Sequence, residues 1–156
     1  MEPKEVVRRF VDEYQTAADE RAFDELLDPD VVDHDRPPGI EPGAPGVRQQ
    51  FDGFRASFSG FRATILDQLA DGDKVVTRKV FTGTHDGPFQ GIAPTGREVE
   101  IHVIDIVRVA GDRIVEHWGL VDRLGLLAQL GAPPGAPAAA AQGSSSRSVT
   151  GSAAPR

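Results

Sequence analysis

The sequence contains no cysteine, which excludes a disulfide framework and any chemistry that depends on a thiolate. No apolar run approaches the roughly 18 residues that a membrane-spanning helix needs. The charged start, Met1 to Glu5, lacks the apolar core of a secretory signal. We therefore expect a soluble, cytoplasmic protein with no membrane partner.

Basic residues are in deficit, since 17 Lys and Arg stand against 24 Asp and Glu and the formal net charge is −7. A nucleic-acid-binding surface needs a surplus of basic residues on one face. The nearest approach to a cluster, Lys74, Arg78 and Lys79, has acids close by. We expect no nucleic-acid partner and a neutral or apolar small molecule instead.

Familiar catalytic motifs are also missing. The four histidines are scattered without the spacing of a metal site. No glycine-rich phosphate loop opens a helix, and there is no nucleophile elbow. The sequence predicts no metal, no cofactor and no covalent catalysis.

The composition changes near residue 131. Before it, apolar residues recur with the periods of helices and strands; residues 132–156 are rich in Pro, Ala, Gly and Ser and show no apolar face. Such a segment cannot bury enough surface to offset its ordering entropy. We predict one domain over 1–131 and a disordered tail over 132–156.

Spacing along the domain predicts a mixed architecture. Helices are expected at about 3–14, 19–27, 47–58 and 123–130, a short extended segment at 31–35, and strands at about 61–70, 74–85, 98–109 and 113–121. Helices first and an antiparallel meander afterwards predict an α+β fold with helices packed on one face of the sheet. A twisted sheet curls, and the space under the helices suits a small ligand.

The strand at 98–109 carries the most informative residue, Asp105. It is the only polar side chain on a face otherwise made of aliphatic residues: Val99, Ile101, Val103, Val107 and Val109. A buried carboxylate must be paired or hydrogen-bonded. Burial also raises a carboxyl pKa, which suits a general acid or base. The alternative is a structural Asp tied to a backbone amide or an arginine.

The neighbouring strand, 113–121, offers Asp105 one of two partners. A three-residue hairpin loop places His117 beside Asp105, and a two-residue loop places Glu116 there, because a slip of one residue flips every side chain. If His117 is the neighbour, Asp105 could orient its imidazole for proton transfer. Otherwise His117 is a half-exposed strand residue.

The remaining candidates have structural alternatives. His34 points into the core if Val32 does, with Asp33 and Asp35 then facing water; it is a pocket donor or a satisfied core residue. His85, at a strand end, suits a turn or the pocket rim. Asp122 suits the N-cap of the last helix. Two aromatic residues are further substrate-binding candidates: Phe54, on a stripe that also suits the core, and Trp118, whose phase favours a subunit interface.

Several segments together resemble a known family. They are Val32-Asp33-His34, Gly83-Thr84-His85, Pro94-Thr95-Gly96-Arg97, Ile104-Asp105-Ile106-Val107-Arg108, and Gly111 to Gly131 with its Glu116-His117-Trp118. Over residues 4–131 the chain is similar to the SnoaL-like polyketide cyclases and ester cyclases of the nuclear-transport-factor-2-like superfamily. The resemblance implies a cone-shaped fold, a homodimer or homotetramer, and acid–base chemistry without a cofactor.

The characterised cyclases close a polyketide ring by intramolecular aldol condensation, using an aspartate and a histidine on adjacent strands. Matching the turn Arg108-Val109-Ala110-Gly111 and the Gln-Leu-Gly ending places that aspartate at Gly119 and that histidine at Asp105. Neither residue is matched. The resemblance thus leads to the hypothesis that Asp105 and His117 have replaced the usual pair.

The leading hypothesis is therefore a polyketide-cyclase-type enzyme acting on a small apolar or polyketide-like substrate. Asp105 is the general base or acid, His117 its partner, and His34 a donor to a carbonyl or enolate. A second hypothesis is an epoxide hydrolase or isomerase on the same fold. A third is a non-catalytic binding module for an apolar metabolite, which Gly119 favours because the family's acid is missing.

Overall fold

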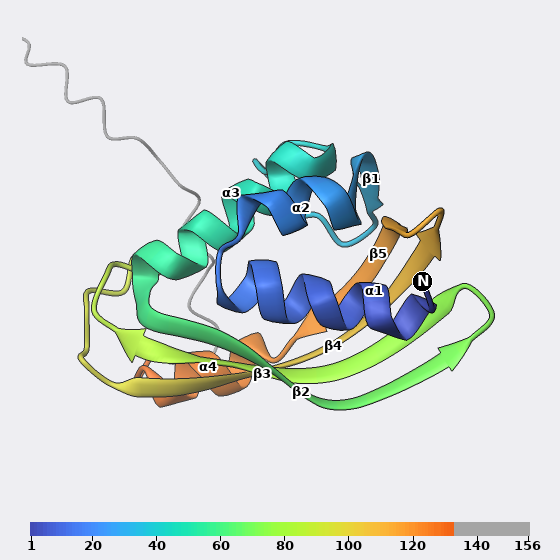
Figure 1. Ribbon diagram of the computed structural model, residues 1–156. Helices are drawn as coiled ribbons and strands as arrows, with labels where there is room; N and C mark the ends of the chain where they lie inside the picture. The colour runs from blue at the N-terminus through green and yellow to red at the C-terminus, as the bar shows by residue number, and fades with distance from the viewer. Residues whose placement is uncertain (133–156) are drawn as a thin grey trace, which may run out of the picture.

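The computed structural model describes residues 1–132 and has the α+β class predicted from the sequence (Figure 1). In chain order its elements are α1 (Pro3–Arg9), η1 (Phe10–Thr16), α2 (Glu20–Leu26), β1 (Leu27–Asp33), α3 (Gly43–Ser57), β2 (Phe58–Asp71), β3 (Lys74–His85), β4 (Glu98–Ala110), β5 (Arg113–Val121) and α4 (Arg123–Gln129). Apart from Ala132, the predicted tail lies outside the described residues.

The strands form one curved sheet in the order β1-β5-β4-β3-β2. Strands β2 to β5 are an antiparallel meander, as expected. Strand β1, however, pairs in parallel with β5 at the edge. The sheet is therefore mixed, which is possible because α3 and three strands separate β1 from β5 along the chain.

The N-terminal helices cover one face of this sheet (Figure 1). Pro3 lies at the start of α1, where its missing N–H costs nothing. The helix continues without interruption into η1, a π-helical stretch in which Ala17 N–H donates to the Asp12 carbonyl. Four apolar side chains of this helix are buried against the core: Val6, Val7, Phe10 and Val11.

Side-chain N-caps mark the starts of two short helices, α2 and α4. The Asp19 side chain accepts the Arg21 N–H at the start of α2, and that of Asp122 accepts the Gly125 N–H at the start of α4. The prediction of Asp122 as an N-cap is confirmed. These caps supply acceptors that the first turn of a helix lacks.

The outer face of the sheet exposes several apolar side chains, among them Ile104, Ile106 and Leu120. The inner face of β4 carries the buried residues, as its alternation predicted. No helix in the described part of the chain is both long and apolar enough to cross a bilayer.

Candidate functional site

A cavity of about 170 Å³ lies between the inner face of the sheet and the helices α1, η1 and α3. Most of its wall is apolar, with contributions from Val7, Val11, Phe51, Phe54, Phe81 and Val107. Its polar lining consists of seven side chains: Gln15, Asp33, Asp35, Gln50, Lys79, Asp105 and His117. An apolar pocket with a few convergent polar groups is the usual form of a small-molecule site.

His117 reaches this pocket because of a β-bulge. The β4–β5 hairpin turns through two residues, Gly111 and Asp112, with Ala110 opposite Arg113. That loop alone would place Glu116 on the inner face. The register then shifts by one between Arg108 and Val109 on β4. The extra residue returns His117 to the face of Asp105.

Asp105 is paired with a buried lysine. The Lys79 Nζ lies 2.5 Å from Asp105 Oδ2, and both side chains are almost fully enclosed. Lys79 comes from the inner face of β3, next to the phenyl ring of Phe81. The second carboxylate oxygen, Asp105 Oδ1, is buried and has no hydrogen-bond partner among the described residues.

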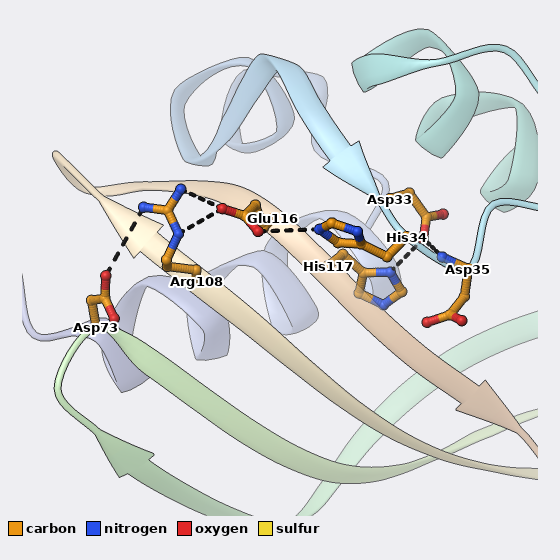
Figure 2. Close-up of polar contacts among 7 residues, drawn as sticks. All are labelled: Asp33, His34, Asp35, Asp73, Arg108, Glu116 and His117. Carbon is orange, nitrogen blue, oxygen red and sulfur yellow. Dashed lines mark hydrogen bonds and ion pairs between the residues drawn. The ribbon is translucent and has the colours of Figure 1, made fainter.

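Asp33 holds the other side of the His117 ring (Figure 2). The ring Nδ1 lies 3.0 Å from Asp33 Oδ1, while Nε2 lies 3.8 Å from Asp105 Oδ2. Gln50 on α3 donates to Asp33 Oδ2, and the backbone N–H of Asp35 donates to Asp33 Oδ1. The imidazole thus spans carboxylates from β1 and β4.

These contacts set the charge states. Burial alone would lower the pKa of His117, but the carboxylates of Asp105 and Asp33 raise its pKa to about 9. Burial would raise the pKa of Asp105, but Lys79 and His117 hold its pKa below the ordinary value. Against burial, the hydrogen bond from His117 likewise holds the pKa of Asp33 low. At neutral pH His117 is therefore an imidazolium between the carboxylates of Asp33 and Asp105.

The state of Asp105 corrects the sequence-based expectation, which was that burial raises its pKa. Two cations nearby outweigh desolvation. Asp105 is therefore ionised at neutral pH, and His117 is the protonated partner beside it.

Asp35, two residues after Asp33 in the sequence, lies at the pocket rim. Its carboxylate accepts the backbone N–H of Gly119 at 2.8 Å. Asp33 and Asp35 were expected to face water and His34 to face the core. The structure reverses this phase: Val31 is buried and Val32 is exposed.

His34 accordingly does not line the pocket, and its ring points toward Glu116 (Figure 2). Its ring stacks on Trp118 with the centroids 4.4 Å apart, and its Nε2 lies 3.1 Å from Glu116 Oε2. Glu116 also accepts from Arg108, which reaches Asp73. A role for His34 inside the pocket is incompatible with this position.

The other candidates separate in the same way. Phe54 lines the pocket and stacks on Phe61. Trp118 lies on the outer face beside Lys74, in the phase that favours an interface. His85 is fully buried away from the pocket, with Nδ1 within 3.0 Å of Thr95 Oγ1. Only Asp105, His117 and Phe54 of the predicted site residues meet in one cavity.

Sequence reasoning missed Asp33, Asp35 and Lys79 as pocket groups. For Lys79 a signal existed: it is the only charged residue among the alternate positions Val75, Thr77 and Phe81 of its strand. That is the pattern that singled out Asp105 on β4. Within residues 1–132, no group of three or more His, Asp or Glu side chains is arranged to hold a metal ion.

Comparison with known proteins identifies the family. The model of the SnoaL-like polyketide cyclase family matches residues 5–130. The chain belongs to this family, which confirms the resemblance stated from the sequence. No curated protein matches the chain significantly.

Solved structures agree with this assignment. IdmH from Streptomyces antibioticus, a provisionally assigned polyketide cyclase, is 34% identical over 85% of this chain and 100% of its own, with a TM-score of 0.75. TsrD from Streptomyces laurentii is 31% identical over 83% and 95%, with a TM-score of 0.75. AclR from Streptomyces galilaeus, a provisionally assigned hydroxylase, is 26% identical over 87% and 89%, with a TM-score of 0.74.

Proposed function

We propose that the chain is a cofactor-independent acid–base catalyst that cyclises a small, largely apolar carbonyl compound by intramolecular aldol or related chemistry. One observation carries the proposal: the imidazole of His117, held between the carboxylates of Asp33 and Asp105, faces an apolar cavity. The family assignment supports the reaction class.

His117 is the proposed acid and oxyanion donor. Its Nδ1–H is engaged by Asp33, whereas the 3.8 Å between Nε2 and Asp105 Oδ2 exceeds hydrogen-bond length. Nε2–H is therefore free to donate to a substrate oxygen. A charged donor in an apolar site stabilises a developing enolate strongly.

Asp105 is the proposed base, acting through the unpartnered Oδ1. It takes a proton from the carbon next to the carbonyl, and the enolate carbon attacks a second carbonyl of the same molecule. His117 protonates the alkoxide that forms. The proton on Asp105 then returns to His117, so the enzyme is restored.

The test is turnover of a polyketide-like β-keto ester, together with deuterium exchange at its α carbon. We expect Asp105→Asn and His117→Gln to lower both rates by at least the 10²-fold typical of acid–base catalysis. Two exposed residues supply matched controls, Asp67→Asn and His102→Gln. Unchanged rates in both site variants would refute the proposal.

Epoxide opening is a second candidate, favoured by the carboxylate–imidazolium–carboxylate arrangement of Asp33, His117 and Asp105. One carboxylate would orient water while His117 protonates the epoxide oxygen. Incorporation of ¹⁸O from labelled water into a diol distinguishes this reaction from cyclisation. An isomerase would exchange α protons without forming a ring, and a binding module would do neither.

Self-association into a homodimer or homotetramer and a cytoplasmic location remain predictions. The exposed apolar side chains Ile104, Ile106 and Leu120 support association through the outer face of the sheet. We also propose that residues 1–131 form the catalytic domain.

A further inference from the structure

Gly119 occupies the position on β5 directly opposite Asp105 on β4. In an antiparallel pair, residues opposite each other place their side chains side by side on one face. A residue with a side chain at 119 would therefore lie against Asp105. Glycine leaves that space empty.

The ring of His117, two residues earlier on the same face, fills the space. A Cβ atom built at Gly119 would lie 2.7 Å from His117 Cε1 and 2.8 Å from Nε2, closer than real Cβ contacts allow. The same Cβ would lie 3.5 Å from Asp105 Cβ. A methyl group at 119 would thus stand between the imidazole and the carboxylate.

We propose that Gly119 is a positioning residue: its missing side chain lets the His117 ring lie across β5, so that one imidazole faces both Asp33 and Asp105. The geometric part of this proposal stands alone; its catalytic meaning rests on the proposed function of His117. Gly119 itself neither donates nor accepts a proton in the proposed reaction.

Backbone conformation does not explain the glycine. Gly119 is absent from the residues with positive φ, so an alanine can adopt its backbone angles without strain. Alanine also keeps the N–H that Gly119 donates to Asp35 Oδ2. The requirement for glycine comes from the imidazole above it.

The charged groups around the ring determine what a shift would do. Asp33 on β1 holds Nδ1, Asp105 on β4 faces Nε2, Lys79 on β3 pairs with Asp105, and Asp35 lies at the rim. A methyl group at 119 would push His117 Nε2 away from Asp105, while the contact between Nδ1 and Asp33 would be kept. The imidazole would lose one of its two anions while staying buried.

The experiment is an NMR titration of His117 in the wild type and in Gly119→Ala. We expect the His117 pKa to fall from about 9 by one unit or more, because an opposite charge at this range shifts a pKa by about 1–3 units. Gly53→Ala is the matched control, since a Cβ there meets nothing within 4 Å. An unchanged His117 pKa in folded Gly119→Ala would overturn the proposal.

A double-mutant cycle on the urea midpoint covers the case in which Gly119→Ala folds poorly. In a His117→Ala background the ring is gone, so Gly119→Ala should leave the midpoint unchanged. An equal loss in both backgrounds would overturn the proposal. Both readouts are independent of turnover: if the proposed reaction fails, they still decide whether Gly119 positions the ring.

Discussion

Lys79 Nζ and Asp105 Oδ2 lie 2.5 Å apart with only 3% and 4% of their side chains exposed, so the two groups form an ion pair inside the core. Such pairs stabilise a fold weakly as a whole, yet the loss of one member leaves an uncompensated buried charge. The pair therefore restricts which substitutions the pocket tolerates.

Lys79→Met is expected to lower the free energy of unfolding by about 3–5 kcal/mol, the range for breaking a buried ion pair. The double variant Lys79→Met/Asp105→Leu should regain most of that loss, because no charge is then left unpaired. Urea denaturation measures both. Lys4→Met, at an exposed position of α1, is the control. A loss below 1 kcal/mol in Lys79→Met would show that the pair is hydrated in solution.

Stability should depend on the protonation of His117. Its folded-state pKa, about 9, is above the value of 6.5 for a free histidine. The contribution of its charge is therefore complete below pH 6.5 and is lost as the pH rises through 9. We expect the free energy of unfolding of the wild type to fall between pH 6.5 and 9.5 and that of His117→Gln to change less. Parallel curves for the two proteins would contradict this.

The pH dependence of activity should also follow the protonation of His117. Because His117 must be protonated to donate from Nε2, kcat/KM is expected to hold through neutral pH and to fall above about pH 9. Replacement of Asp33 by Asn should move this limb to lower pH, since one of the two carboxylates that raise the pKa is removed. If the alkaline fall in kcat/KM stays at the same pH in Asp33→Asn, the group that causes it is not His117.

Much of the fold could be predicted from residue patterns, because long periodic segments such as 98–109 have only one arrangement that buries their valines and isoleucines. The phase of β1 could not. Val31 and Val32 are both apolar, so either can face inward, and that choice decides whether Asp33 or His34 enters the pocket. The contact of Asp33 with His117 forms across the parallel pair of β1 and β5, between residues 84 positions apart in the sequence, so no local pattern predicts it.

The partner of Asp105 illustrates a different limit. Hairpin loop length alone predicts His117 beside Asp105 for a three-residue loop and Glu116 there for a two-residue loop. The loop has two, and a bulge reverses the outcome. The extra residue is Val115 on β5, between Ile114 and Glu116, and a valine does not signal a bulge by residue type, so this register could not be predicted from the sequence.

The outer face of the sheet should mediate self-association. Leu120 and Ile104 lie opposite each other on β5 and β4 with 76% and 52% of their surfaces exposed. Burying them between two copies removes apolar surface from water, whereas a lysine there would have to be desolvated. We expect the wild type to sediment as a dimer or larger and Leu120→Lys to shift toward the 16.7 kDa monomer. Ala17→Lys adds the same charge at the end of η1, in the helical layer, and should leave the wild-type state unchanged. A wild type that sediments as a monomer at micromolar concentration would refute this assignment, and an equal shift in both variants would attribute the effect to charge rather than to the face.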